Sequence, residues 1–149
     1  MKYIRLPLSI TIALSWGGCT NVCKEENSNL REPHYTLHPI GKIVKEKNKT
    51  LIVLENKYQS GLLGLDQLSQ VTVIYWFDQN DTPEKRSILQ VRPRGDKRNP
   101  IRGVFATHSP VRPNLIAISR CKILSVRDNI VEIDDIDAFP DSPVLDLKN

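Results

Sequence analysis

Short apolar runs separated by turn residues recur along the chain from about residue 39 onward. Seven runs have the length and the β-branched content of strands: 40–44, 50–55, 71–77, 86–92, 115–126, 129–134 and 143–147. The turn at residues 127–129 predicts a hairpin between the fifth and the sixth run. Only residues 60–69 have helical spacing, and two glycines keep that helix short. The pattern predicts an all-β fold, either a small antiparallel barrel or a sandwich, with at most one short helix.

The first 38 residues differ in composition from the rest of the chain. Lys2 and Arg5 precede an apolar run, and small residues precede Cys19, which is the layout of a secretory signal with a lipid-accepting cysteine. The apolar run is shorter than the ~20 residues of a transmembrane helix. The polar stretch that follows has no periodicity. We therefore predict three segments: a signal-like segment at 1–18, a polar linker at 19–38 and one folded domain at 39–149.

Charge is unevenly distributed along this chain of net charge +4. Seven basic and only two acidic residues lie from Glu84 to Arg102, whereas from Asp128 onward seven acidic residues are opposed by Lys148 alone. A basic surface attracts polyanions and an acidic one attracts small cations, although both patterns also suit ordinary solvated faces. The spacing of the three cysteines predicts no metal site, and we expect Cys121, in the longest apolar run, to be buried and inert.

The chain contains no GxGxxG, P-loop, HExxH or GxSxG motif, so a Rossmann-type cofactor fold is not indicated. The most distinctive stretch is GVFATHSPVRPN at 103–114. Pro110 and Pro113 restrict the backbone around Arg112. His108 and the serine after it point to opposite faces of an extended segment, which argues against a catalytic pair. A stiff loop of this kind can hold a ligand, or it can be a rigid corner of a barrel.

Three stretches together resemble the TsaA-like family, whose best-known members are the TrmO-type tRNA N6-methyltransferases. They are GVFATHSPVRPNLIAIS at 103–119, DIDAFPDSPVLDLK at 135–148 and the first run, IGKIV, so that the resemblance covers about residues 39–148. It implies a small β-barrel that binds S-adenosylmethionine, is often a homodimer, and methylates N6 of threonylcarbamoyladenosine in tRNA. The chain departs from the family pattern at His108, where the family has Arg, and lacks its PRQPG-like loop after the first strand.

The resemblance also implies which residues bind the methyl donor and the tRNA. The donor contacts would be Phe77, Asp78, His108, Ile118, Asp137, Ala138, Phe139 and Ser142. An aromatic ring and carboxylates suit the sulfonium cation of the donor. His108 is the candidate base, since histidine exchanges protons near neutral pH. The candidate contacts to tRNA phosphates are Arg92, Arg94, Lys97, Arg98 and Arg112.

These observations leave two functions open. The first is an S-adenosylmethionine-dependent tRNA methyltransferase, which acts in the cytoplasm, where mature tRNA is found. The second is an envelope-anchored lipoprotein, attached to the membrane through a lipidated Cys19, whose TsaA-like domain binds a ligand or a partner without catalysis. The central motif favours the first function and the signal-like segment favours the second. A later start of translation would reconcile the motif with a cytoplasmic enzyme.

Overall fold

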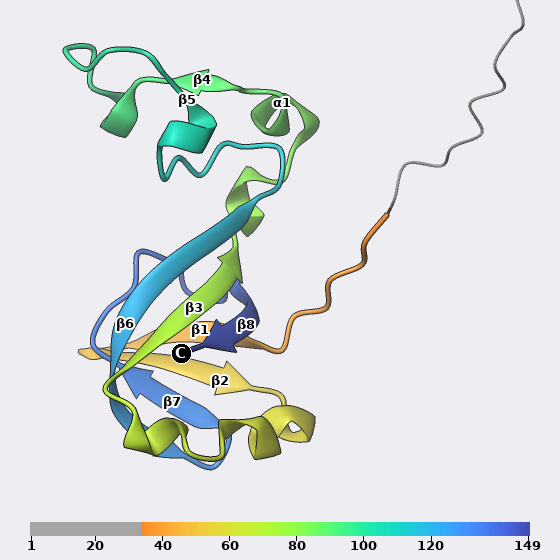
Figure 1. Cartoon of the computed structure of the whole chain (residues 1–149), viewed down its shortest axis with the longest axis vertical. Helices are drawn as coiled ribbons and strands as arrows, with labels where there is room; N and C mark the ends of the chain where they lie inside the picture. Colours follow the sequence, from red (N-terminus) through yellow and green to blue (C-terminus); the bar gives the residue numbers. More distant parts are fainter. Residues whose placement is uncertain (1–33) are drawn as a thin grey trace, which may run out of the picture. The chain divides into compact units, whose positions relative to one another are not determined.

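Six strands close into an antiparallel barrel in the computed structural model, which describes residues 34–149 (Figure 1). In the order in which they pair, these are β1 (Gly41–Glu46), β2 (Lys49–Leu54), β7 (Ile130–Ile133), β6 (Ile116–Arg127), β3 (Gln70–Trp76) and β8 (Pro143–Lys148). The last strand pairs with the first, so the sheet closes on itself. The all-β prediction, the barrel and the β6–β7 hairpin are confirmed.

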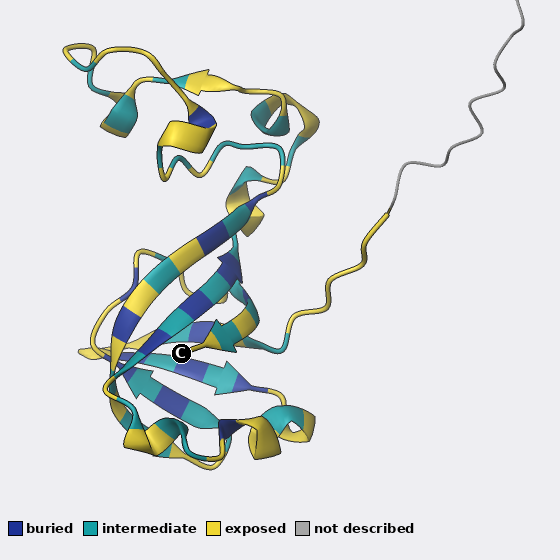
Figure 2. Ribbon diagram, in the orientation of Figure 1, coloured by how far each residue is buried: buried dark blue, intermediate teal, exposed yellow. Residues whose placement is uncertain are grey.

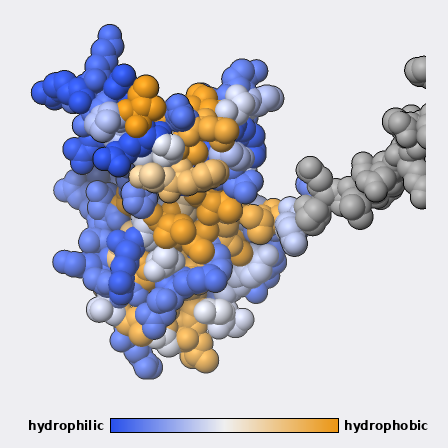
Figure 3. Space-filling model, turned by 45° about the horizontal axis from the view of Figure 1, so that its top comes forward, coloured by the Kyte–Doolittle hydropathy of each residue, from blue (hydrophilic) through white to orange (hydrophobic). Residues whose placement is uncertain are grey.

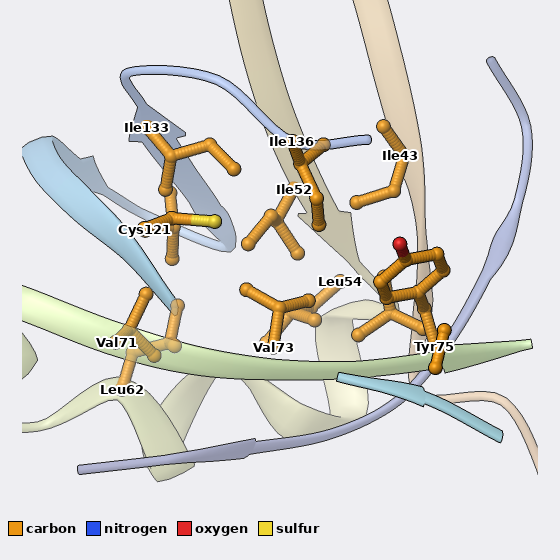
Figure 4. Packing of buried hydrophobic residues seen from close by; sticks show 13 residues of the cluster. Ile43, Ile52, Leu54, Leu62, Val71, Val73, Tyr75, Cys121, Ile133 and Ile136 are labelled. Atoms are coloured by element: carbon orange, nitrogen blue, oxygen red, sulfur yellow. The ribbon is translucent and has the colours of Figure 1, made fainter. Parts of the chain in front are cut away.

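Alternation of side chains along the strands fills the barrel with apolar groups. On β3, Val71, Val73 and Tyr75 face inward and are at most 3% exposed, while the residues between them are partly exposed. Figure 2 shows these alternating stripes of burial on the strands. The other strands and the β7–β8 loop add Ile43, Ile52, Leu54, Ala117, Cys121, Val131, Ile133, Ile136 and Val144. Figure 4 shows Tyr75 at one end of this cluster and Cys121 with Ile133 at the other.

Cys121 is buried, as the apolar run predicts. It is 2% exposed and lies opposite Val71 in the ladder between β3 and β6. Burial, followed by the charges of Asp134 and Asp135, raises the pKa of the Cys121 thiol to about 11. The thiol therefore stays protonated and unreactive in the folded protein at neutral pH.

This raised pKa predicts a loss of stability in alkaline solution. Above the ordinary thiol pKa of about 8.5, the unfolded chain releases the Cys121 proton while the folded chain still holds it. The free energy of unfolding should then fall by about 2 kcal/mol as the pH rises toward 11. Urea unfolding under reducing conditions, compared between wild type and Cys121→Val, isolates this contribution because every other group is shared. Equal pH slopes in the two proteins would contradict it.

The segment 60–69, predicted as one short helix, forms parts of two 3₁₀ helices instead. These are η1 (Asn56–Leu62) and η2 (Leu65–Gln67). Gly64 separates them because its φ of 82° is a left-handed conformation that no right-handed helix contains. Leu62, the buried residue of η1, packs into the barrel cluster. The two 3₁₀ helices connect β2 to β3.

The run 86–92, predicted as a strand, contains only the short strand β4 (Gln90–Val91). This strand pairs with β5 (Arg102–Gly103) in a small sheet separate from the barrel. The start of the run belongs to α1 (Pro83–Arg86), the one α-helix within residues 34–149. Thr82 caps this helix by accepting a hydrogen bond from the backbone N–H of Lys85. Only Arg86 of the run lies in this helix, and residues 87–89 belong to neither a helix nor a strand.

Residues 77–115 connect β3 to β6 and are called the lobe below. The lobe lies past the end of the barrel at which β3 ends and β6 begins (Figure 1). The lobe holds η3 (Asp78–Asn80), α1, β4, η4 (Pro93–Gly95), β5 and η5 (Val104–Ala106). Its two ends meet where the Phe77 N–H donates a 2.9 Å hydrogen bond to the Leu115 carbonyl. Arg86 fixes the lobe further: it donates to the Pro113 carbonyl at 2.7 Å and its guanidinium lies over the Trp76 ring.

The signal-like segment at 1–18, Cys19 and most of the polar linker lie outside the described residues. Residues 36–149 form one compact unit, close to the predicted folded domain. Within residues 34–149, no helix combines the length and the apolar character needed to cross a membrane.

Candidate functional site

Three adjoining cavities lie where the lobe meets the end of the barrel. We name them the mouth pocket, of about 230 Å³, the side pocket, of about 180 Å³, and the arginine cavity, of about 810 Å³. His108 and Asp137 line all three. A ligand in one cavity therefore shares these two residues with a ligand in the next.

The mouth pocket is built from three segments that are distant in sequence. It is lined by Tyr75, Phe77, Asp78, Gln79, Asn80, His108, Pro110, Asp137, Ala138, Phe139 and Ser142. Seven of the eight predicted donor contacts are among them, and the eighth, Ile118, lines the side pocket. The side pocket shares Tyr75, Phe77, His108 and Asp137 with the mouth pocket and adds Arg112, Ala117, Ile118 and Ser119. The fold thus brings the whole predicted set to one end of the barrel.

The residues that follow β3 form one wall of the mouth pocket. Phe77 packs edge-on against Tyr75, with 5.7 Å between the ring centroids and 71° between the planes. Asp78 accepts a 3.3 Å hydrogen bond from the hydroxyl of Ser142, which is buried beside the start of β8. These contacts hold the aromatic ring and the carboxylate of this wall in place.

The loop between β7 and β8, residues 134–142, forms the opposite wall. Ile136 is 3% exposed and anchors the loop in the barrel cluster. Lys45 donates a 2.7 Å hydrogen bond to the Ile136 carbonyl, and the Tyr75 hydroxyl donates one of 2.7 Å to the Asp137 carbonyl. Hydrogen bonds to two consecutive carbonyls, those of Ile136 and Asp137, therefore fix the backbone that carries the side chains of 137–139.

Ion pairing leaves negative charge at the mouth pocket. Most acids of the C-terminal region pair with lysines, in the pairs Lys42–Asp141, Lys45–Asp135, Lys49–Glu132 and Lys148–Asp146. Asp78 and Asp137 form no ion pair with any residue of the described range 34–149. Their charge makes the mouth pocket favourable for a cationic ligand.

The arginine cavity lies between the small β4–β5 sheet and the loop around His108. Its lining is Val91, Arg92, Pro93, Arg94, Gly95, Arg102, Ala106, Thr107, His108, Ser109, Pro110 and Asp137. Of the predicted tRNA contacts, only Arg92 and Arg94 line it. Arg112 lines the side pocket, whereas Lys97 and Arg98 line none of the three cavities. Arg98 instead pairs with Asp96 at 2.7 Å.

Apolar side chains also border the pockets. Ile118 is 60% exposed and Phe139 is 57% exposed, although both line a cavity. Figure 3 shows one face of the molecule, on which apolar side chains gather in an area between hydrophilic surfaces. Exposed apolar groups next to a pocket offer contacts to the flat faces of a ligand.

Tyr75 is the main site residue that sequence reasoning missed. It is 3% exposed, and burial raises the pKa of its phenol. Its hydroxyl binds the Asp137 carbonyl and lies 3.4 Å from Ser119 Oγ. The alternation that turns Val73 inward also turns Tyr75 inward at the barrel end. The hydroxyl contact itself follows only from the fold.

Tyr75→Phe should loosen the β7–β8 loop without emptying the core, because it removes the hydroxyl and keeps the ring. We expect a stability loss of about 1 kcal/mol and faster hydrogen exchange at the amides of 136–139. Tyr58→Phe is the matched control, since Tyr58 lies in η1 and lines none of the three cavities. The same exchange rates in both variants would show that the Tyr75 hydroxyl does not hold this loop.

The fold of the described chain matches solved structures. A crystal structure of TrmO from Pseudomonas aeruginosa aligns with a TM-score of 0.59 and 26% identity, over 78% of this chain and 55% of that one. Another TrmO crystal structure aligns with a TM-score of 0.60 and 27% identity, over 78% of this chain and 57% of that one. The chain spans about half the length of the TrmO chains that it matches.

Sequence relatives agree with this match. A probable S-adenosyl-L-methionine-binding protein of Methanocaldococcus jannaschii is 44% identical over 114 residues, 76% of this chain and 90% of the relative. One of Pyrococcus horikoshii is 41% identical, over 76% of this chain and 81% of the relative. A tRNA (adenine(37)-N6)-methyltransferase of Rattus norvegicus is 35% identical, over 62% of this chain and 21% of the rat protein. Since the family model of the tRNA-methyltransferase O N-terminal domain matches residues 32–149, the chain belongs to that family, as its central motif predicts.

Proposed function

We propose that this protein is an S-adenosylmethionine-dependent tRNA methyltransferase that acts on N6 of threonylcarbamoyladenosine. The observation that carries the proposal is the mouth pocket, where seven of the eight donor contacts implied by the family resemblance meet. Relatives named as S-adenosyl-L-methionine-binding proteins support the donor. The family and the name of the rat relative support a tRNA adenine as the acceptor.

The residues of the mouth pocket fit the methyl donor chemically. S-adenosylmethionine supplies a methyl group carried on a positively charged sulfur. Asp78 and Asp137 provide negative charge without a lysine or arginine partner in the described chain, and the Phe77 ring provides a face for a cation. The side pocket, which shares four lining residues with the mouth pocket, extends the available space toward β6.

We assign His108 the role of base. It is exposed, it forms no hydrogen bond within residues 34–149 and it lines all three cavities. An imidazole there can take the proton that N6 loses when it gains a methyl group. The carbamoyl substituent on N6 makes this N–H more acidic than in plain adenosine, which lowers the demand on the base.

The basic side of the site suits an RNA partner. Arg92, Arg94 and Arg102 line the arginine cavity, and Lys97 and Arg98 lie in the connection between β4 and β5. Positive side chains next to a pocket attract the phosphates of tRNA. The modified adenosine lies in the anticodon loop, where unpaired bases can enter a protein pocket.

Two measurements test the proposal. Calorimetry should detect binding of S-adenosylmethionine to the purified chain, and no binding at millimolar donor would reject the enzyme. Nucleoside mass spectrometry of tRNA from a deletion strain should show loss of the methylated form, and re-expression of the wild type should restore it. His108→Ala should not restore it. An unaltered methylated fraction in the deletion strain would reject tRNA as the target.

A further inference from the structure

We propose that the arginine cavity binds a carboxylate on the N6 substituent of the acceptor base, with Arg94 and Arg102 as the residues that select an acidic adenosine over a neutral one. The inference rests on the proposed function for the identity of the acceptor. It goes beyond that function because it assigns a second binding site and a reason for substrate choice.

Among the arginines of the cavity, Arg94 and Arg102 have guanidinium groups without a partner in the described chain. Neither forms an ion pair or donates a side-chain hydrogen bond within residues 34–149. Elsewhere in the lobe, Arg86 pairs with Asp81 at 2.8 Å and Arg98 pairs with Asp96. Within the described residues of the lobe, ion pairing therefore neutralises Arg86 and Arg98 and none of the three arginines that line the cavity.

The remaining charges of the cavity keep it positive. Arg92, the third arginine, donates a 2.6 Å hydrogen bond to the Asn99 carbonyl, which orients its guanidinium without neutralising it. Asp137 is the one acidic residue among the described residues that line the cavity, and it also lines the mouth pocket. An anion entering the arginine cavity meets three guanidinium groups against one carboxylate.

The backbone that carries these arginines is fixed. Arg102 lies on β5, opposite Val91 of β4. Arg94 has a φ of 58° in η4, and the Asn99 side chain supports that turn by donating a 2.9 Å hydrogen bond to the Pro93 carbonyl. A guanidinium is planar and pairs with a carboxylate through two parallel hydrogen bonds. Because both arginines start from a held backbone, only their side chains lose conformational freedom when they bind an anion.

The position of the cavity matches a substituent on the atom that accepts the methyl group. The cavity shares His108, Pro110 and Asp137 with the mouth pocket. A substituent on N6 begins at the nitrogen that accepts the methyl group. With that nitrogen next to His108, the substituent extends from the mouth pocket into the arginine cavity. At about 810 Å³ the cavity is larger than the mouth pocket and can hold such a group. The threonyl part of the substituent ends in a carboxylate.

The test compares binding of two RNAs to the full chain in the presence of S-adenosylhomocysteine. One anticodon stem-loop carries threonylcarbamoyladenosine, and the other carries the same group with its carboxylate converted to the primary amide. We expect wild type to bind the acid RNA about tenfold more tightly. Arg94→Gln and Arg102→Gln should each bring this ratio close to one. Arg127→Gln, at the β6–β7 turn and outside all three cavities, should keep it.

Two outcomes would overturn the inference. One is equal affinity of the wild type for both RNAs. The other is an equal loss of affinity for both RNAs in Arg94→Gln and Arg102→Gln, since that result would assign these guanidinium groups to phosphates of the RNA. Methyl transfer to each RNA is measured separately. If the wild type prefers the acid RNA in binding but methylates neither, the carboxylate site stands and the proposed function fails.

Discussion

Replacing Asp78 and Asp137 together with asparagine should weaken binding of S-adenosylmethionine about a hundredfold and binding of S-adenosylhomocysteine much less. Both carboxylates line the mouth pocket, and neither has an ion-pair partner within residues 34–149. The two ligands differ by a methyl group and one positive charge on sulfur, so their affinity ratio isolates the charge. A carboxylate near that charge contributes about 1.4 kcal/mol, between the aqueous and near-surface limits, which is tenfold for each residue.

Calorimetry with both ligands measures this effect. Asparagine keeps the shape of aspartate, and the amide oxygen can still accept the hydrogen bond that Ser142 donates to Asp78. Asp66→Asn, in η2 and outside all three cavities, is the matched control and should leave both affinities unchanged. Equal losses for the charged and the neutral ligand would mean that the double variant had altered the pocket itself, and the electrostatic role would be rejected.

Gly41→Ala should lower the free energy of unfolding by about 3 kcal/mol or more. A Cβ at Gly41 would lie 2.7 Å from Leu54 Cα and 2.9 Å from Leu54 Cδ2, and it would also overlap the Val53 carbonyl oxygen. Two of these atoms are backbone and cannot move aside as the end of a flexible side chain can. Gly41 pairs with Leu54 on β2 and with Val144 on β8, so the clash falls where β1 closes the barrel.

Gly61→Ala is the control for this prediction. A Cβ at Gly61 meets nothing within 4 Å, and alanine there should change stability by less than about 1 kcal/mol. Urea unfolding of the wild type and the two variants gives the comparison. If Gly41→Ala were as stable as Gly61→Ala, close approach of β1 and β2 would not explain the glycine of the IGKIV motif.

Two expectations concern properties outside the described residues or beyond one chain. Lipidation at Cys19 and the localisation that follows from it stay predictions, to be tested by membrane fractionation of wild type and Cys19→Ser. A soluble wild type would reject the anchor. The homodimer implied by the family resemblance also stays a prediction, and sedimentation of the purified chain measures it.

Local pattern predicted the barrel well because strand alternation is a property of neighbouring residues. The apolar runs at 71–77 and 115–126 anticipated the strands β3 and β6, and the second of them anticipated the burial of Cys121. Prediction from the local pattern failed where backbone geometry outweighs that pattern. Gly64 breaks the predicted helix, and of the predicted strand at 86–92 only the two residues of β4 form a strand, while Arg86 ends the helix that Thr82 caps.

The sequence by itself determined the six strands of the barrel, the family and the set of residues expected around the donor. Only the tertiary structure decided which charges remain free. Lysines of β1 and β2 pair with acids about 80 to 100 positions later in the chain, whereas Asp78 and Asp137, at the mouth pocket, form no ion pair within residues 34–149. Asp96 likewise neutralises Arg98 and not Arg94. Charge pairing depends on distances of a few ångströms between residues far apart in sequence, and those distances exist only once the barrel has closed.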